Sequence, residues 1–426
     1  MTSQIKQRIE QIRRGEVPDG YKKTKVGVIP NEWEETRFKK MFSRLSRKNK
    51  ENNDNVLTIS AQYGLISQRD FFNKDIASED KSNYFLLHKG EFAYNKSYSN
   101  GYPFGALKRL DMYDKGIVSP LYICFSANEN NECPDFYVHY FEAGMMNREI
   151  QAFAQEGARN HGLLNISVDD FFNSYLLIPT RPEQEKIAGI LSAQDNIVDL
   201  YERKIEKLEK QKKAFMQKMF PQKGESVPRL RFPQFTDPWE ERKFGTMFKR
   251  RTERNNGQFD NTRWISVAKM YFQEAEKVSS NNIDTRTYVM RRGDIAFEGH
   301  SNTEYKYGRF VANDIGDGVI SELFPIYMHI DEYDESYWKY AIQIENIMAP
   351  KLLRCIEISY TSSNKLDEDF FLRESVLVPS ISEQQQIGLF FRSMDNLIKV
   401  NQQKLAQEKQ KKKALMQLLL TGIVRV

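Results

Sequence analysis

Two stretches of the chain carry apolar side chains at alternating steps of four and three residues. The first stripe consists of Ile187, Leu191, Gln194, Val198, Tyr201, Ile205, Leu208, Lys212, Phe215 and Met219. The second consists of Ile387, Phe391, Met394, Ile398, Asn401, Leu405, Glu408, Lys412, Leu415 and Leu419. A stripe of this spacing over more than four heptads predicts two long helices that pack against another helix. At 1.5 Å per residue, roughly 38 residues would form a rod of about 57 Å.

Polar residues interrupt both stripes, at Gln194 in the first, at Asn401 and Glu408 in the second, and at the matched Lys212 and Lys412. Polar groups in a helix–helix seam can fix the register of the pair. Frayed positions, or long side chains that extend toward water, are the alternative. We favour the role in register.

The two stretches belong to an internal repeat. Residues 178–220 align with residues 378–420 without a gap, at a shift of 200 positions. Weaker matches upstream, such as Trp33 with Trp239, extend the repeat over most of the chain, with shifts between 206 and 199. Such drift is typical of surface loops that have gained or lost residues. Each unit therefore combines about 145 divergent residues with about 40 well-matched ones.

The divergent segments are predicted to be mixed α/β domains. Aromatic and β-branched runs at residues 84–87, 120–125, 174–178 and 324–330 are typical of strands, whereas residues 135–154 and 336–352 have helical patterns. The predicted segments are an N-terminal helix and linker (1–30), a first globular domain (31–180), a central helix (181–221), a linker (222–238), a second globular domain (239–380), a C-terminal helix (381–420) and a tail (421–426).

The predicted fold class is α+β, with two globular α/β domains in tandem repeat, separated and followed by long helices. Because one copy cannot bury its stripe alone, the helices should form an antiparallel coiled-coil spacer with pseudo-two-fold symmetry. A short apolar face at Ile5, Ile9 and Ile12 precedes the first unit. The order of the segments resembles a cyclic pattern opened between Val426 and Met1. This layout would complete the two-fold symmetry if the two chain termini meet.

Composition narrows the class of protein. The 426 residues include 40% hydrophobic ones, which is ample for packed cores, and the formal net charge is only +5. Basic runs at residues 44–50, 249–254, 204–213 and 409–413 permit nucleic-acid binding without requiring it. Three cysteines without a CxxC pair, no apolar run of membrane-spanning length and no signal-peptide pattern predict a cytoplasmic protein without structural zinc.

Familiar catalytic motifs are missing. The sequence contains no GxGxxG, no GxxxxGK[ST], no HExxH and no GxSxG, and no Asp-Pro-Pro or Asn-Pro-Pro segment of the kind that adenine methyltransferases use. The histidines are scattered through the chain and fit structural roles better than metal ligation. We therefore expect that the chain is not an enzyme by itself and has neither catalytic nor metal-ligating residues.

The ordered set of motifs resembles the specificity (S) subunits of type I restriction-modification systems. The resemblance rests on the opening at residues 20–33, the re-opening at residues 227–240, the two helices that begin with Glu-Gln, and the terminal Leu-Leu-Thr-Gly-Ile-Val-Arg425. No single motif is decisive, but the set occurs in duplicate and covers essentially the whole chain.

The resemblance implies a division of labour. Each divergent part (31–180 and 239–380) would be a target recognition domain that reads one half of a bipartite double-stranded DNA site. The helices would set the gap between the halves and dock two modification (M) subunits, to which restriction (R) subunits are added. S-adenosylmethionine would belong to M and ATP with Mg to R, with no cofactor in this chain. The assembled complex would methylate adenine N6 or cleave DNA.

Candidate DNA contacts follow from residue type, since basic, amide and aromatic side chains in loops can reach phosphates or bases. In the first domain they are Arg44, Arg47, Lys48, Lys50, Tyr63, Lys96, Tyr98, Lys108, Arg159 and Asn160. In the second they are Arg250, Arg251, Arg254, Lys269, His300, Asn302, Lys306, Arg309, Asn364 and Lys365. For each one, a solvated surface side chain is the alternative. The predicted helix-packing residues are Ile187, Leu191, Val198, Ile205, Ile387, Phe391, Ile398 and Leu405.

Two other functions compete with DNA recognition. The main one is a tandem-repeat protein–protein adaptor with a coiled-coil scaffold and no DNA specificity, and the second is a nuclease with an unrecognised carboxylate site. The basic residues in the predicted loops count against the adaptor. The sequence does not encode which bases would be read, because side-chain identity without docking geometry does not determine them.

Overall fold

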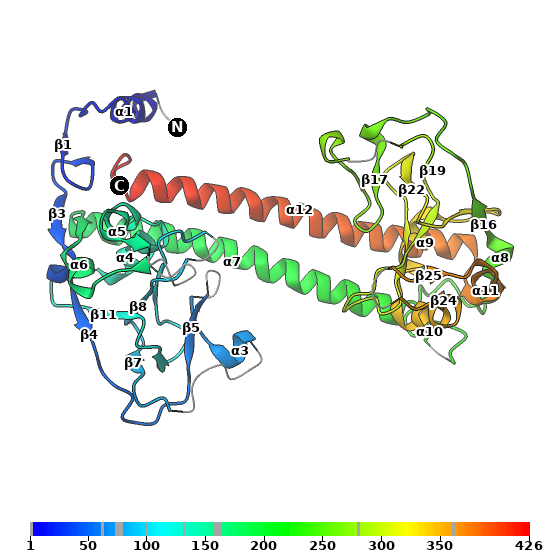
Figure 1. Cartoon of the computed structure of the whole chain (residues 1–426), viewed down its shortest axis with the longest axis horizontal. Helices are drawn as coiled ribbons and strands as arrows, with labels where there is room; N and C mark the ends of the chain where they lie inside the picture. The colour runs from blue at the N-terminus through cyan, green and yellow to red at the C-terminus, as the bar shows by residue number, and fades with distance from the viewer. Residues whose placement is uncertain are drawn as a thin grey trace. The chain divides into compact units, whose positions relative to one another are not determined.

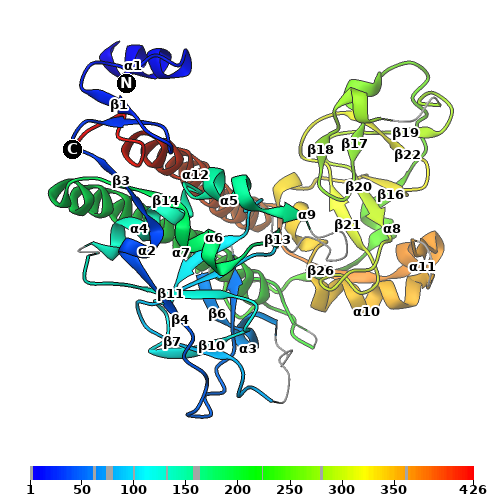
Figure 2. The same ribbon diagram turned by 60° about the vertical axis from the view of Figure 1, so that its left-hand side comes forward.

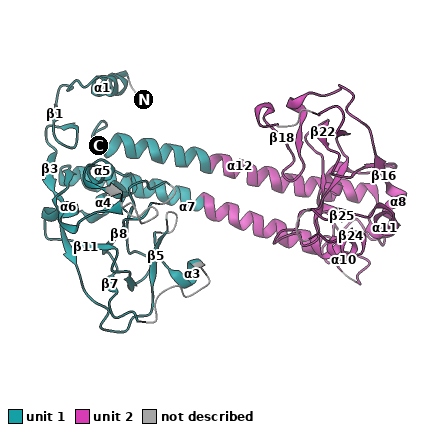
Figure 3. Ribbon diagram, viewed as in Figure 1, with its two compact units in different colours: residues 1–200, 405–426 teal, residues 201–404 magenta. Residues whose placement is uncertain are grey.

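The structure is a computed structural model that describes residues 3–60, 64–72, 80–98, 101–130, 133–156, 164–222, 224–278, 282–359 and 363–426. The chain divides into two compact units (Figure 3). Unit 1 contains residues 1–200 and 405–426, and unit 2 contains residues 201–404. Each unit therefore takes one part of each long helix, which explains why the sequence repeat and the compact units have different boundaries.

The two long helices are α7 (Arg181–Lys218) and α12 (Ile381–Leu419). Every position of the two predicted stripes is buried or half-buried. Several apolar residues off the stripes are exposed, for example Leu200 at 65% and Leu389 at 55%, although Ala188 and Met416 are buried. In unit 1 the start of α7 packs on the end of α12, and in unit 2 the end of α7 packs on the start of α12. The pairing within each unit is antiparallel, as the stripes predict.

The polar interruptions of the stripe join the two helices at most positions. Gln194 donates a hydrogen bond of 2.6 Å to the Glu408 carboxylate. Lys212 forms an ion pair across the helices with Asp395, as Lys412 does with Asp195. The prediction was wrong for Asn401, whose side-chain amide donates to Leu397 O in its own helix rather than to α7. An amide that satisfies itself against the preceding helical turn does not select a partner.

Each unit is built on a four-stranded antiparallel sheet. In unit 1 the strand order is β4 (Phe42–Leu45), β11 (Ile123–Ala127), β8 (Phe92–Asn95) and β9 (Ala106–Arg109). In unit 2 it is β16 (Phe248–Arg251), β23 (Ile326–His329), β20 (Ile295–Glu298) and β21 (Arg309–Ala312). The identical order in sequence and in space confirms that the divergent segments share one fold.

Two-stranded sheets complete both units (Figure 1). In unit 1 the pairs are β1 (Tyr21–Lys23) with β2 (Val28–Pro30), β3 (Glu34–Arg37) with β14 (Tyr175–Ile178), β5 (Leu57–Ser60) with β6 (Gly64–Ser67), β7 (Phe85–His88) with β10 (Lys115–Val118), and β12 (Gln155–Glu156) with β13 (Leu164–Asn165). In unit 2 they are β15 (Glu240–Lys243) with β26 (Ser375–Val378), β17 (Ile265–Ser266) with β18 (Tyr271–Phe272), β19 (Thr287–Met290) with β22 (Gly318–Ser321), and β24 (Ile356–Glu357) with β25 (Lys365–Leu366).

Short helices accompany the sheets. Unit 1 has α1 (Ser3–Arg13), α2 (Phe38–Met41), α3 (Gln68–Phe72), α4 (Pro134–Glu142), α5 (Asn147–Phe153) and α6 (Val168–Asn173). Unit 2 has α8 (Phe244–Met247), α9 (Glu335–Ala341), α10 (Glu345–Cys355), α11 (Glu368–Arg373) and the 3-10 helices η1 (Asn261–Arg263) and η2 (Ala275–Lys277). Each of the two helical stretches predicted from the sequence is thus a pair of helices.

Aromatic side chains form the core beneath each four-stranded sheet. In unit 1, Phe38 is completely buried and its ring centroid lies 4.7 Å from those of Phe42 and Phe171. In unit 2, Phe371 is buried with its centroid 4.7 Å from that of Phe244 and 4.5 Å from that of Phe310. These rings pack the short helices and the end of the long helix onto the sheet.

The first and last segments of the chain meet in unit 1, which is the condition that the cyclic layout requires. Tyr21 OH donates a 2.7 Å hydrogen bond to Gly422 O, and Arg8 donates to Ile423 O. Both views show the C-terminal end beside β1 (Figures 1 and 2). The Arg425 guanidinium reaches further, to the Glu183 carboxylate at the start of α7. The C-terminal tail therefore links the N-terminal segment of unit 1 to the start of α7.

Candidate nucleic-acid interface

Two connections meet at one edge of the unit 2 sheet. They are the loop between β20 and β21 (299–308) and the segment that leads into β25 (363–365). Asn364 N donates to Gly299 O at 3.0 Å, and its side-chain Nδ2 donates to Ser301 Oγ at 3.1 Å. A Cβ atom added to Gly299 would lie 2.2 Å from Asn364 O. A residue without a side chain is thus needed for the two segments to approach so closely.

This edge gathers seven of the sequence-predicted residues of the second domain. A third segment reaches it, because Arg309 donates to Ala268 O next to Lys269. The His300 ring lies 2.6 Å from the buried Glu298 carboxylate. The seven residues are Lys269, His300, Asn302, Lys306, Arg309, Asn364 and Lys365. We call them the unit 2 edge cluster.

Members of the unit 2 edge cluster divide into fixed and exposed side chains. Asn364 is only 5% exposed, and Asn302 Oδ1 accepts the backbone N–H groups of Glu304 and Tyr305, so both amides shape the loop. Lys269, Lys306 and Lys365 are exposed and form no salt bridge within the described ranges. Fixed amides with exposed ammonium groups around them make a preformed cationic rim, which suits phosphate oxygens.

Unit 1 repeats this arrangement at the equivalent edge of its sheet. Leu164 N donates to Lys96 O at 3.1 Å, just as Asn364 N donates to Gly299 O. Lys96 is half-buried in the loop after β8, and the Tyr98 side chain is 63% exposed. Three predicted residues, Tyr63, Arg159 and Asn160, lie outside the described residues. The loop 157–162, predicted to approach a ligand, has the same place in the chain as the segment before Asn364.

Other predicted residues of unit 1 are divided between free and internally paired cations. Arg47 forms a two-pronged salt bridge with Glu91, and Lys108 pairs with Glu142. Lys48 donates to Asn83 O and lies over the Phe85 ring. Arg44 and Lys50 are exposed, and no contact of their side chains is found in the described part of the unit. The exposed pair has every side-chain donor available for a phosphate among the described residues, whereas the other three cations already use some of their donors within the unit.

The three predicted arginines around β16 all contact internal acids. Arg251 holds Asp294 with two hydrogen bonds, Arg254 pairs with Glu322, and Arg250 lies 3.8 Å from Glu368. Burial raises the pKa of Asp294, and the Arg251 guanidinium opposes that rise. A buried carboxylate of this kind needs its partner to stay charged, so Arg251 supports the sheet. The sequence reveals arginine positions but not these tertiary partners.

The sequence reasoning missed one duplicated feature. Glu183 and Glu383, at the starts of the two long helices, are 3% and 1% exposed. Arg425 binds Glu183 and Arg231 binds Glu383, each through two hydrogen bonds. The signal was present, because Glu-Gln recurs at the shift of 200. The repeat of Glu-Gln did not indicate which arginine would form the ion pair with each glutamate.

The described part of the chain contains no cluster of potential metal ligands. No group of three or more His, Cys, Asp or Glu side chains within the described ranges is arranged to hold a metal ion. Cys124, Cys133 and Cys355 are free and buried, and burial raises the pKa of each thiol. Among the helices that the structure describes, none is long and apolar enough to cross a lipid bilayer.

Comparison with known proteins gives consistent relatives, although no protein-family model matches the chain. It is 24% identical over 337 residues to the type I restriction enzyme MjaVIII specificity subunit of Methanocaldococcus jannaschii, covering 73% of this chain and 75% of the relative. It is 21% identical over 439 residues to the putative type I restriction enzyme MjaX specificity subunit of that organism, covering 96% and 97%. The chain resembles type I restriction enzyme specificity subunits.

Solved structures show the same fold. One is a chain from a study of complex assembly and conformational transition of the type I R-M system, with a TM-score of 0.54, 14% identity and coverage of 93% of this chain and 99% of that one. Another is the S subunit of a type I restriction-modification system from M. genitalium, with a TM-score of 0.50, 12% identity and coverage of 91% and 96%. The relatives and the fold confirm the resemblance stated from the sequence.

Proposed function

We propose that this chain is the sequence-specific DNA-recognition subunit of a type I restriction-modification complex, with each unit reading one half of a bipartite site. The observation that carries the proposal is the duplicated edge. The Lys96–Leu164 contact in unit 1 and the Gly299–Asn364 contact in unit 2 place a polar loop at the equivalent position of each unit's four-stranded sheet. The side chains on those loops differ, as expected of readers for two different half-sites.

The long helices take the part of a spacer in this proposal. Every position of the two predicted stripes is buried or half-buried, as expected of helices that pack on each other. A packed helix pair is stiff, and its length would translate into the number of unread base pairs between the half-sites. Two modification subunits would dock on the chain and restriction subunits would join them. They would bring S-adenosylmethionine and ATP with Mg, respectively, and the complex would act in the cytoplasm.

The protein–protein adaptor remains the competing function. It would use the same helix scaffold, but the edge clusters would contact protein and the exposed lysines would serve only solubility. The lysine rim of the unit 2 edge cluster favours DNA, because Lys269, Lys306 and Lys365 come from three separate segments and converge on one edge. Acidic side chains lie near this rim as well: Glu304 in the loop of Lys306 and Glu357 opposite Lys365 in the β24–β25 ladder are exposed, whereas Glu298 at the end of β20 is buried.

Co-expression with a candidate modification subunit, followed by sequencing of methylated bases in the host DNA, tests the proposal. We expect a bipartite adenine motif with a fixed gap. Lys269→Ala, Lys306→Ala and Lys365→Ala together should reduce methylation of that motif, while Lys243→Ala on β15 serves as a matched lysine control. Absence of new methylation together with no retention of DNA at moderate salt would reject DNA recognition in favour of the adaptor.

A further inference from the structure

A hairpin in unit 1 covers strand β3 near the start of α7. Its tip, Thr24–Gly27, joins β1 to β2. Val26 N donates to Glu35 Oε2 at 2.9 Å, and Val26 O accepts a hydrogen bond of 3.0 Å from Arg148 on α5. The Val26 side chain packs against the unit 1 core. One residue is thus held by a carboxylate, a guanidinium and an apolar surface.

Tyr175 on β14 provides a second anchor for the same hairpin. Lys25 Nζ donates to Tyr175 OH at 2.8 Å and lies 4.7 Å from the centre of the ring. A cation over a tyrosine ring adds to the hydrogen bond. The adjacent tip residues Lys25 and Val26 therefore contact two neighbouring strands, β14 and β3 respectively.

Unit 2 has the strands but not the hairpin. Pro18 and Trp33 are 15 positions apart, whereas the matching Pro228 and Trp239 are 11 positions apart. Residues 228–239 are all described and contain no strand. The four missing residues are enough to form the tip of a hairpin. The surface of unit 2 that corresponds to the one covered by the tip in unit 1 is therefore not covered by a hairpin of residues 228–239.

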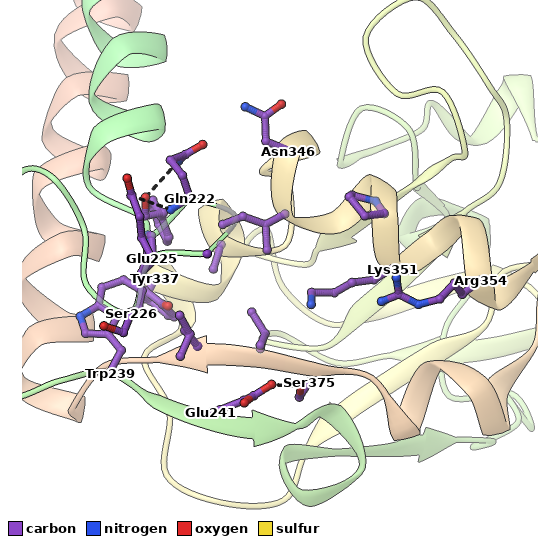
Figure 4. A pocket seen from close by; sticks show the side chains of 18 residues that line it. Gln222, Glu225, Ser226, Trp239, Glu241, Tyr337, Asn346, Lys351, Arg354 and Ser375 are labelled. Carbon is purple, nitrogen blue, oxygen red and sulfur yellow. Dashed lines mark hydrogen bonds between the residues drawn. The ribbon is translucent and has the colours of Figure 1, made fainter.

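A cavity of about 530 Å³ lies at that surface (Figure 4). Glu241 lines it and pairs with Leu377 across the β15–β26 ladder, as Glu35 pairs with Leu177 across β3–β14. Ser375 lines it too, at the position that Tyr175 has in unit 1. The replacement of a tyrosine ring by a serine removes one anchor and widens the space.

The lining retains the chemistry that holds the tip in unit 1. The Glu241 carboxylate accepts from Ser375 Oγ through Oε1, and no contact of Oε2 is found in the described ranges. Lys351 on α10 also lines the cavity and makes no hydrogen bond or salt bridge with a described residue. Burial lowers the pKa of Lys351, and the nearby Glu374 carboxylate opposes that shift. Phe220, Trp239 and Tyr337 supply an apolar wall.

We propose that this cavity binds a hairpin or extended segment of a partner polypeptide, which presents a small aliphatic side chain to the apolar wall. The backbone N–H of that residue would donate to Glu241, and its carbonyl would accept from Lys351. The occupant would complete in unit 2 what the β1–β2 hairpin completes in unit 1. The inference goes beyond DNA recognition and does not depend on it.

The hairpin of this chain is the probe. A synthetic peptide with the sequence of residues 20–31, closed by a disulfide between cysteines added at its ends and carrying a fluorophore, is titrated with the full-length protein. In the intact chain unit 1 is already occupied by its own hairpin, so fluorescence anisotropy reports on unit 2. We expect saturable binding. Glu241→Ala should weaken it by about tenfold or more, since a hydrogen bond to a carboxylate is removed.

Two controls make the result decisive. A peptide with Val26→Asp should not bind, because binding would bury an unpaired carboxylate against the apolar wall of the cavity. Ser375→Tyr should tighten binding by restoring the anchor for Lys25, a gain that misfolding cannot produce. No saturable binding up to about 1 mM peptide, or binding that survives Glu241→Ala and the Val26→Asp change, would overturn the proposal. A Ser375→Tyr protein that binds no more tightly would contradict the use of unit 1 as the template.

Discussion

Lys412 Nζ on α12 lies 2.6 Å from Asp195 Oδ1 on α7. The same bond recurs in unit 2, where Lys212 Nζ lies 2.6 Å from Asp395 Oδ1. Each aspartate also meets its own globular domain. His139 Nδ1 lies 3.6 Å from Asp195, and Tyr340 OH donates to Asp395 at 2.7 Å. The lysines thus join the two helices at the points where the domains attach.

The first prediction concerns this register. Asp195→Lys should destabilise unit 1, because it brings two ammonium groups together within the seam. The exchange Asp195→Lys with Lys412→Asp should restore about 1 kcal/mol or less of the free energy of unfolding, since both side chains are partly exposed. Hydrogen exchange along α7 and α12 measures the effect. Equal protection in the single and the exchanged variants would exclude a role in register.

The second prediction concerns the C-terminal tail. Arg425→Ala leaves the buried Glu183 carboxylate with only the Trp33 indole N–H as a donor among its described contacts. We expect the free energy of unfolding of unit 1 to decrease by about 2 kcal/mol. This is less than the cost of breaking a fully buried ion pair, because the Arg425 side chain is 36% exposed. Urea denaturation followed by hydrogen exchange in unit 1 measures it. Arg13→Ala, at an exposed pair with Glu10, is the control and should change little.

The third prediction concerns pH. Burial lowers the pKa of His329 to about 3, and neither ring nitrogen has a hydrogen-bond partner in the described ranges. The unfolded chain binds a proton at His329 near pH 6.5, whereas the folded chain does not. The contribution of the neutral histidine to the free energy of unfolding is therefore complete above pH 6.5 and falls as the pH decreases toward 3. Between pH 6.5 and 5, unit 2 should lose up to about 2 kcal/mol of stability from this group.

His329→Phe provides the control for this pH effect. The ring of Phe can keep the stacking on Tyr333, where the centroids are 3.5 Å apart. Comparison of unfolding at pH 7 and pH 5 for both proteins isolates the histidine. An equal decrease of stability in the two would show that His329 does not titrate as its burial requires.

The fourth prediction concerns DNA affinity. Lys269→Ala, Lys306→Ala and Lys365→Ala should each weaken binding to all DNA sequences and reduce the slope of log K against log salt by about 0.9 for each phosphate that is no longer neutralised. Lys243→Ala should leave the slope unchanged. Titrations of labelled duplex at several salt concentrations, with the assembled complex, provide the measurement. If the slope of log K against log salt were the same in the three rim variants as in Lys243→Ala, the lysine rim would not be part of the DNA interface.

The fifth prediction concerns the spacer. Insertion of one heptad after Leu200 in α7 and another after Lys404 in α12 preserves the seam and adds about 10.5 Å of helix. We expect the unread gap of the methylation motif to grow by about three base pairs, with both half-sites unchanged. Altered half-sites with the original gap would refute the spacer role, and methylome sequencing distinguishes the outcomes.

Local regularity made much of the architecture readable from the sequence. The stripes that begin at Ile187 and Ile387 repeat every three or four residues, and a helix must bury such a stripe, so the helix pair and its antiparallel packing followed directly. The shift of 200 indicated the duplication, and the cyclic order of the segments left open whether the chain termini meet. The resemblance to specificity subunits rested on the same order of motifs.

Only the tertiary structure decided which side chains are available. Arg44 and Arg47 look alike in the sequence, but Arg47 is bound to Glu91, 44 positions away, and Arg44 is exposed. The same holds for the missing hairpin of unit 2, because four residues fewer in a linker do not reveal the cavity beside Glu241. Helix stripes depend on neighbours a few residues apart, which a sequence displays. Ion pairs, loop convergence and cavities depend on residues that folding alone brings together.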